Sequence, residues 1–187
     1  LSPDLPIAHG YCRPYNYIEL PDEEGLFELR DVPHGTLTQE FYKSKISDNW
    51  EKLIVYLPPC VPSAGLPVLY LQHGFGESEI SWSTTGKVNF LMDNLIAAGK
   101  IKPFAIVMGN GMVKQRIDGE LKLNRALYGQ MLVEEILPMI EKKYQFGGSK
   151  EKRGMAGLSM GSVQTTRTIC AHPELFSEVG IFSGFLR

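Results

Sequence analysis

The stretch KRGMAGLSMGSVQTTRTICA (residues 152–171) decides the fold. Its first part has the composition of a short apolar strand, its second part that of a helix, and the turn between them carries Ser159 flanked by Gly157 and Gly161. A strand, a tight glycine-containing turn and a helix in this order form a repeating unit of parallel α/β sheets. We therefore predict a parallel sheet, with Ser159 on a turn at the carboxyl end of one strand.

Three further segments have the composition of buried strands. Residues 67–74 (PVLYLQHG) and 103–111 (PFAIVMGNG) precede the serine turn, and residues 178–184 (EVGIFSG) follow it. The segment 67–74 is apolar on both faces, as expected for a central strand of a sheet that helices cover on both sides. Ligands in such sheets bind beyond the carboxyl ends of the strands, so the candidate site should lie at that edge.

Two helices are predicted between these strands. In residues 87–100 the apolar side chains recur at the spacing of an amphipathic helix, and Gly99 supplies a stop. Residues 125–144 form a longer helical pattern, in which Pro138 is expected to cause a kink or a break. Strands separated by helices imply right-handed crossovers and a mainly parallel sheet with helices on both faces. The predicted fold class is α/β.

The N-terminal part of the chain has a different character. Residues 36–45 and 51–59 are rich in β-branched and aromatic residues, and they predict an antiparallel hairpin. Residues 1–35 carry five prolines and several turn formers, which suits an extended arm lying on the domain. We therefore divide the chain into an extended N-terminal arm, 1–35, and one α/β domain, 36–187.

Composition excludes several classes of partner. The formal charge of the 187 residues is -2 with both signs interspersed, so neither nucleic acid nor a membrane is expected as a partner. The apolar runs are far shorter than the ~18 residues of a membrane span. Cys12, Cys60 and Cys170 and the four histidines match no metal-binding pattern, so we expect isolated thiols with at most one disulfide, and no catalytic metal. The chain begins at Leu1 without a signal-peptide pattern, so any signal peptide was removed or never present.

The setting of Ser159 gives it a chemical meaning. A serine on a strained strand-to-helix turn projects its hydroxyl from the top of the sheet, as a nucleophile must be presented. Acyl transfer through such a serine also needs two N–H donors for the developing oxyanion. The N–H of Met160 is one candidate, and the N–H of Phe75, in the loop HGFGE (73–77), is the other. The alternative is an ordinary glycine-rich turn with an incidental serine.

The loop 73–77 permits two further interpretations. His73 could be a base, but its place where strand meets loop favours a ring that holds the loop by hydrogen bonds. The letters GFG (74–76) could suggest a dinucleotide site, but Glu79 stands where that pattern requires its third glycine.

Several segments together resemble the esterase family of α/β hydrolases, which includes enterochelin esterases, feruloyl esterases and acetylxylan esterases. The resemblance runs in order from about residue 31 to the end of the chain. The segments that carry it are DVPHGT (31–36), VYLPP (55–59), PVLYLQHGFGESEISW (67–82), DNLIAAGKIKPFAIVM (93–108), LVEEILPMIEKKY (132–144), MAGLSMGS (155–162) and HPELFSEVGIFSG (172–184).

The resemblance implies an α/β-hydrolase fold and a serine carboxylester hydrolase that forms an acyl-enzyme and needs no cofactor. Ser159 would be the nucleophile, the Phe75 and Met160 amides would be the oxyanion donors, and an acyl group would bind near Gly74 and Asn110. The most similar members release feruloyl or acetyl groups from xylan, which implies an ester-bearing polysaccharide as substrate and a secreted protein. An esterase of siderophore or thioester substrates is a further possibility within the family.

The general base and its carboxylate are not found in this chain. In this fold the triad order is Ser, then Asp or Glu, then His, but no acidic residue lies between Ser159 and His172. His172 is predicted to end the helix that starts at the serine, and Glu174 and Glu178 lie at the wrong end of the last strand. We therefore expect that C-terminal strands are missing and that a further segment of the same protein carries both groups. The alternative is a catalytically inactive binding module.

Overall fold

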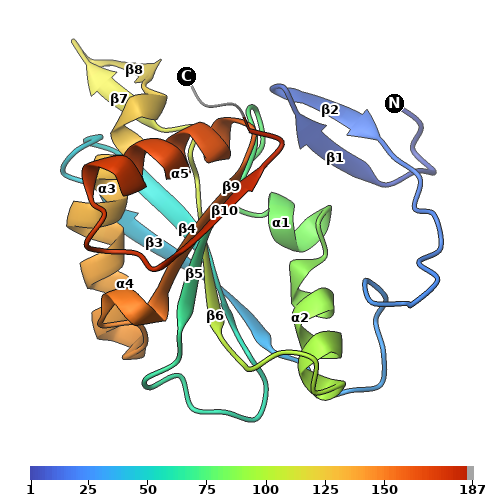
Figure 1. The fold of residues 1–187 in the computed structure, drawn as a ribbon. Coiled ribbons are helices and arrows are strands. Elements are labelled where there is room, and N and C mark those ends of the chain that lie inside the picture. The colour runs from blue at the N-terminus through green and yellow to red at the C-terminus, as the bar shows by residue number, and fades with distance from the viewer. Residues whose placement is uncertain (185–187) are drawn as a thin grey trace.

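A six-stranded sheet forms the centre of the protein (Figure 1). The computed structural model describes residues 1–184. The strand order is β10-β9-β5-β6-β4-β3. The strands are β3 (Thr36–Lys43), β4 (Trp50–Leu57), β5 (Val68–Gln72), β6 (Ala105–Gly109), β9 (Arg153–Leu158) and β10 (Glu178–Phe182). Strands β10, β9, β5 and β6 run parallel, while β4 pairs antiparallel with β6 and with β3. The prediction of a mainly parallel sheet preceded by an antiparallel hairpin is confirmed.

Helices cover both faces of this sheet (Figure 1). The helices α1 (Ser81–Thr84) and α2 (Val88–Ala97) lie on one face, and α3 (Tyr128–Met131), α4 (Leu137–Tyr144) and α5 (Met160–Ala171) lie on the other. Side chains of one strand alternate between the two cores: Tyr70 of β5 packs with the α3–α4 side, and Leu71 packs with α2. Because helices cover both faces of the sheet, the predicted α/β class is confirmed.

The helix α2 confirms the prediction for residues 87–100, but its polar side is buried as well. Asp93 is 2% exposed, and its carboxylate accepts hydrogen bonds from Tyr56 Oη at 2.6 Å and from Gly35 N at 2.9 Å, while His34 Nδ1 lies 2.9 Å away. The amide of Asn94 donates to backbone carbonyls at residues 26 and 28. The arm therefore packs along α2 and satisfies the polar groups that an amphipathic pattern assigns to solvent.

The helical stretch 125–144 changes type where the proline was expected to disturb it. A 3₁₀ turn (Arg125–Leu127) leads into α3, a π turn (Leu132–Ile136) follows, and α4 then begins one residue before Pro138. Pro138 has no N–H, and its ring would crowd the carbonyl four residues earlier in a regular α-helix. The wider π turn, in which Leu137 N donates to Leu132 O, accommodates the proline without interrupting the helix.

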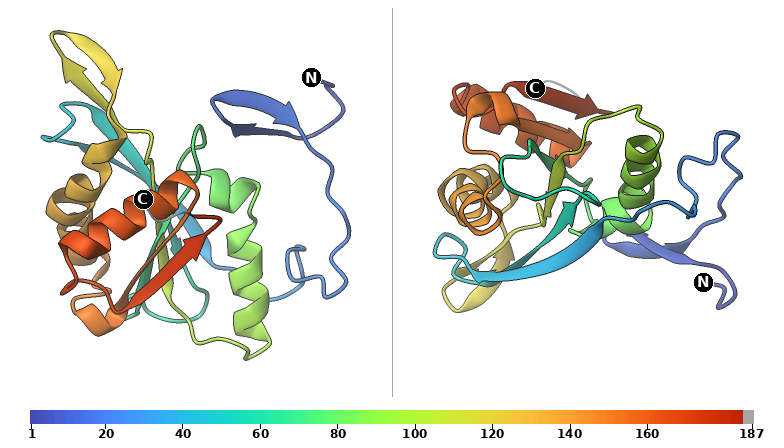
Figure 2. Two further views of the ribbon diagram at one scale, coloured as in Figure 1. Left: turned by 45° about the horizontal axis from the view of Figure 1, so that its top comes forward. Right: turned by 90° about the horizontal axis from the view of Figure 1, so that it is seen from below.

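Two small hairpins stand apart from the central sheet, and the sequence patterns predicted neither. The first joins β1 (Ile7–Gly10) to β2 (Arg13–Asn16) within the arm, and the second joins β7 (Lys114–Ile117) to β8 (Glu120–Leu123) after β6. Figure 2 shows the arm running from the first hairpin past α2 before it enters β3. The division of the chain at residue 35 remains a prediction.

Two further sequence expectations concern membranes and thiols. Among residues 1–184 no helix combines the length and the apolar character that a membrane crossing requires. Cys12, Cys60 and Cys170 are all free and exposed, in agreement with isolated thiols.

Candidate active site

The turn between β9 and α5 is strained in a way that its glycines make possible. Ser159 has φ 52° and ψ -109°, a conformation that residues with a side chain rarely adopt. A Cβ atom at Gly157 would fall on the carbonyl group of Gly161, and a Cβ at Gly161 would lie 2.6 Å from Gln72 O and 2.7 Å from His73 O. Only glycine fits at both positions, because strand and helix approach too closely for a side chain.

The facing loop, residues 73–77, is anchored by a buried histidine. His73 is 1% exposed; its Nε2 accepts a hydrogen bond from Gly111 N at 3.0 Å, and its Nδ1 lies 2.7 Å from Gly74 O, to which it donates. Burial lowers the pKa of His73 and favours the neutral ring that this pattern requires. Both ring nitrogens are thus occupied by backbone groups, which supports the structural interpretation of His73 over that of a base.

A cavity of about 530 Å³ lies between the turn and this loop and brings together three of the predicted residues: Ser159, Phe75 and Met160. Its other lining residues are Leu123, Asn124, Arg125, Ala126, Val163, Gln164 and Arg167. Within residues 1–184, neither Phe75 N nor Met160 N donates a hydrogen bond. Two unsatisfied N–H groups beside one serine are what an oxyanion site needs, although the assignment of these roles remains a prediction.

Gly74 and Asn110, the predicted acyl-binding positions, are not among the residues that line this cavity. Gly74 N donates to Glu77 Oε2 at 2.9 Å, within its own loop. Asn110 lines a neighbouring cavity of about 370 Å³, and its Oδ1 accepts a hydrogen bond from Met112 N at 2.9 Å. Their role as substrate contacts remains a prediction.

The arm and a distant arginine hold Phe75 in place. Tyr11 N, at the tip of the β1–β2 hairpin, donates to Phe75 O at 3.0 Å, and Cys12 N donates to Gly76 O at 3.4 Å. The guanidinium carbon of Arg125 lies 4.9 Å from the centre of the Phe75 ring, a cation–π distance. The loop that carries one candidate oxyanion donor is therefore fixed by segments far away in the sequence.

Among residues 1–184, the lining of the Ser159 cavity includes no histidine and no carboxylate. His172 caps the C-terminal end of α5, twelve residues and about 18 Å along the helix axis from its start, and its Nδ1 lies 3.5 Å from Glu174 Oε1. As predicted, His172 is a helix-end residue directed toward a surface carboxylate. Within residues 1–184, no group of three or more His, Cys, Asp or Glu side chains is arranged to hold a metal ion.

Comparison with known proteins places this arrangement in a family. The sequence model of the Esterase family, described as "Putative esterase", matches residues 44–187. The chain belongs to the Esterase family. An endo-1,4-beta-xylanase/feruloyl esterase of Xylanibacter ruminicola is 37% identical over 191 residues, covering 96% of this chain and 26% of the relative. The chain therefore spans about a quarter of the length of that relative.

Solved structures confirm the α/β-hydrolase-type fold of this Esterase-family chain. A CE1 ferulic acid esterase from Anaeromyces mucronatus, in complex with ferulic acid, superposes with a TM-score of 0.78 at 21% identity, over 88% of this chain and 63% of that chain. A serine-to-alanine mutant of the feruloyl esterase module from Clostridium thermocellum, complexed with sinapinate, superposes with a TM-score of 0.71 at 20% identity, over 95% of this chain and 61% of that chain.

Sequence reasoning missed part of the cavity wall of this Esterase-family protein. Val163, Gln164 and Arg167 were not predicted; they follow Met160 at i+3, i+4 and i+7 on α5, so one face of the helix lines the cavity. These positions could have been predicted from the helical spacing, because Ser159 was already placed at the start of the helix. The position of Arg125 could not be predicted, because the β7–β8 hairpin brings it to the site.

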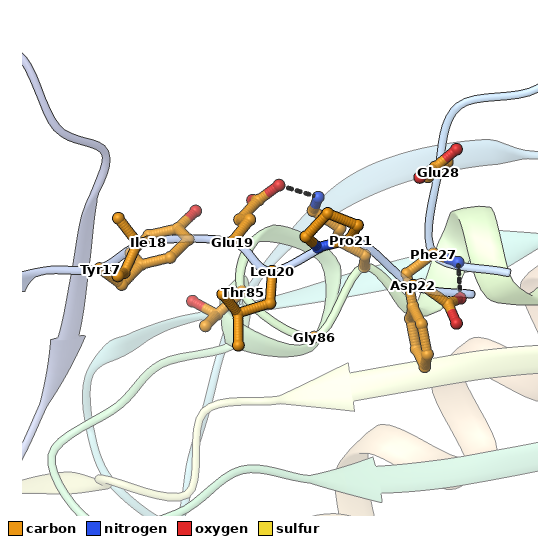
Figure 3. A pocket seen from close by; sticks show the side chains of 11 residues that line it. Tyr17, Ile18, Glu19, Leu20, Pro21, Asp22, Phe27, Glu28, Thr85 and Gly86 are labelled. Atoms are coloured by element: carbon orange, nitrogen blue, oxygen red, sulfur yellow. Dashed lines mark hydrogen bonds and ion pairs between the residues drawn. The ribbon is translucent and has the colours of Figure 1, made fainter. Parts of the chain in front are cut away.

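A second cavity, of about 610 Å³, lies between the arm and the turn that follows α1 (Figure 3). Glu19 of the arm forms an ion pair with Lys87 across it, and Ile18 and Leu20 on its rim are 75% and 83% exposed. None of the residues predicted as site residues lines this cavity. The smaller cavity at Ser159 is therefore the candidate active site of this Esterase-family chain.

Proposed function

We propose that the protein is a serine carboxylester hydrolase that releases feruloyl or acetyl groups from a plant cell-wall polysaccharide such as xylan. One observation carries the proposal: Ser159, on its strained turn, shares a cavity with Phe75 and Met160, whose N–H groups donate no hydrogen bond within residues 1–184. The 37% identity to a xylanase/feruloyl esterase supports the choice of substrate. An extracellular location belongs to the same proposal.

In the proposed reaction, Ser159 Oγ attacks the ester carbonyl carbon and gives its proton to a base. The carbonyl oxygen becomes an oxyanion, toward which the N–H groups of Phe75 and Met160 donate. The carbon–oxygen bond to the sugar then breaks, and the sugar oxygen takes the proton from the base. Water attacks the remaining acyl-enzyme in the same way and releases the acid and Ser159.

The proposal assigns the base and its carboxylate to groups outside the described residues. Two observations support this assignment. The described residues that line the Ser159 cavity include no histidine and no carboxylate, and the chain spans 26% of the length of its curated relative. Without a base, a serine hydroxyl is a poor nucleophile at neutral pH, so the nucleophile alone would not give the proposed rate.

The composition of the cavity wall supports an aromatic acyl group. Phe75, Leu123, Met160 and Val163 present apolar surface next to Ser159. A planar feruloyl group would bury more of that surface than an acetyl group, and burial contributes about 25 cal/mol for each Å² removed from water. We therefore rank feruloyl esters above acetyl esters as substrates.

The test compares hydrolysis of methyl ferulate and p-nitrophenyl acetate by the wild-type protein and by Ser159→Ala. The matched control is Ser177→Ala, which removes an exposed hydroxyl from the segment before β10. We expect Ser159→Ala to lower kcat/KM by roughly a thousandfold or more, and Ser177→Ala to leave it unchanged. Equal turnover by the wild type and Ser159→Ala would refute the proposal.

An intact-mass measurement separates the proposed esterase from an inactive binding module. Brief mixing with p-nitrophenyl acetate should add one acetyl group to the wild-type protein and none to Ser159→Ala. If the wild type neither hydrolyses the esters nor becomes acetylated, but still binds a feruloylated xylo-oligosaccharide, the inactive-module alternative holds instead.

A further inference from the structure

Among residues 1–184, the lining of the cavity at Ser159 carries positive charge without a balancing carboxylate. Arg125 and Arg167 are the charged residues of this described lining. Within residues 1–184, neither guanidinium forms an ion pair with a carboxylate. The whole chain has a formal charge of -2, so this local excess of positive charge does not reflect its overall composition.

Arg125 is held in position from two sides. Its backbone carbonyl accepts a hydrogen bond from Gln164 Nε2 at 3.1 Å, and the same amide nitrogen donates to Gly111 O at 3.0 Å. Its guanidinium lies over the Phe75 ring at 4.9 Å. Gln164 is 7% exposed, so α5 fixes the start of the helical stretch 125–144 through a buried contact. A cation placed in this way loses less side-chain entropy when it binds an anion.

Arg167 lies farther along the same cavity. It follows Met160 by seven residues on α5, which corresponds to about 10 Å along the helix axis. An ester carbonyl at Ser159 cannot itself reach that far. A group that contacts Arg167 must therefore belong to a part of the substrate that extends away from the reacting bond.

We propose that Arg125 and Arg167 form a carboxylate-binding subsite, and that the preferred substrate is an ester-bearing oligosaccharide with an acidic sugar beside the esterified unit. The inference rests on the proposed function for its ester group. Guanidinium groups bind carboxylates through paired N–H donors, and a uronic acid is the carboxylate that a plant polysaccharide chain offers.

One acidic side chain, Glu134, lines a cavity that adjoins the proposed subsite. This cavity, of about 220 Å³, is also lined by Arg125, Arg167 and His172. It makes no ion pair with either arginine within the described residues, so both guanidinium groups keep their donors. Glu134 marks the far boundary of the proposed subsite, because an acidic sugar would be repelled beyond it.

The test measures binding rather than turnover, using Ser159→Ala to prevent hydrolysis. Three xylo-oligosaccharides of equal length are titrated by calorimetry: one feruloylated and neutral, one feruloylated with a uronic acid, and one with the uronic acid but no ester. We expect the acidic feruloylated ligand to bind about tenfold more tightly than the neutral one. That ratio should fall toward one in about 1 M salt, where the Debye length is about 3 Å.

Charge-removing variants in the same background locate the effect. Arg125→Gln and Arg167→Gln should each lower the ratio by about threefold to fivefold, and the double variant should abolish it. The matched control is Lys142→Gln, which removes an exposed cation from α4, away from the cavity, and should leave the ratio unchanged. Because Arg125→Gln also removes the contact with the Phe75 ring, the affinity for the neutral ligand is measured in every variant and serves as the reference for its ratio.

The inference is overturned if Ser159→Ala binds both feruloylated ligands equally, or if the double arginine variant keeps the preference. Failure of the proposed function gives a different result. In that case the wild-type protein hydrolyses no ester. The acidic feruloylated ligand still binds more tightly than the neutral one, the ester-free acidic ligand also binds, and both effects depend on the two arginines.

Discussion

One wall of the Ser159 cavity is the turn 157–161, and the facing wall is the loop 73–77. The turn is fixed by its own neighbours in the sheet: Gly157 and Gly161 touch each other and the end of β5, and Ser159 N donates to Phe182 O at 3.0 Å. The loop is anchored at its start by the buried His73, and Phe75 and Gly76 are held by the tip of the β1–β2 hairpin and by Arg125. The turn is thus specified locally in the sense that its own glycines permit these close contacts, whereas the loop also depends on segments outside the central sheet.

This difference has a consequence for function. A wall built from close backbone contacts in the middle of a sheet can move very little, because protein interiors are close-packed. Beyond His73, the part of the loop that carries Phe75 and Gly76 is held by two hydrogen bonds and one cation–π contact, each of which contributes about 1 kcal/mol. Changes to the turn should therefore affect folding, while changes around the loop should affect activity more than stability.

The largest effect is expected from Gly157→Ala. Its Cβ would collide with the backbone of Gly161, so we expect the free energy of unfolding to fall by about 3 kcal/mol or more and esterase activity to be lost. The matched control is Gly154→Ala in the same strand, where the new Cβ would lie 3.4 Å from its nearest neighbours. Chemical denaturation of both variants makes the comparison. Similar stability for the two would show that the turn is not locally specified.

A smaller effect is expected from Gln164→Met, which removes the bonds that join α5 to the opposite wall. Two carbonyl groups, Gly111 O and Arg125 O, lose their donor, and we expect the free energy of unfolding to fall by about 2 kcal/mol. Gln130→Met, at an exposed position of α3, is the control and should change stability by less than about 0.5 kcal/mol. Equal shifts of the denaturation midpoint in Gln164→Met and Gln130→Met would show that the bonds of Gln164 do not stabilise the fold.

The smallest effect, and the one that tests the loop, is expected from Gly76→Ala. Gly76 and Gly119 have φ of 78° and 83°, so alanine costs both positions about 1 kcal/mol. Only the Cβ at Gly76 would meet another segment, lying 2.0 Å from Cys12 N and 2.5 Å from the Tyr11 backbone, whereas nothing lies within 4 Å at Gly119. We expect kcat/KM for methyl ferulate to fall about tenfold in Gly76→Ala and to change little in Gly119→Ala. Equal kcat/KM values for the two variants would show that the β1–β2 hairpin does not support the role of the loop in catalysis.

The contrast between the two walls also explains what the sequence could predict. The strand, turn and helix around Ser159 could be predicted because the constraint lies in adjacent residues: a short apolar run, then glycines two positions on either side of a serine. The strands β5 and β6 and the helix α2 were readable for the same reason, since burial on both faces or on one helical face leaves a periodic pattern.

Other features depend on contacts that no local pattern records. Asp93 looks like a solvent residue of an amphipathic helix, yet Tyr56, Gly35 and His34 surround its carboxylate. The β1–β2 and β7–β8 hairpins are short and mostly exposed, so they lack the alternation of a half-buried strand. The role of Arg125 could not be predicted, because it requires the second of these hairpins to return the chain to the cavity.

The π turn Leu132–Ile136 also sets how Arg125, at the cavity, is oriented relative to the core residues that follow the turn. A π turn contains one residue more than an α turn. The side chains before it are therefore rotated about the helix axis by about 100° relative to those after it. Tyr128 and Met131 before the turn and Ile140 after it all face the same core. Deleting one residue there would rotate Arg125 away from Ser159 or turn Ile140 out of the core. In this segment the length of the chain, more than its composition, keeps the core and the cavity aligned.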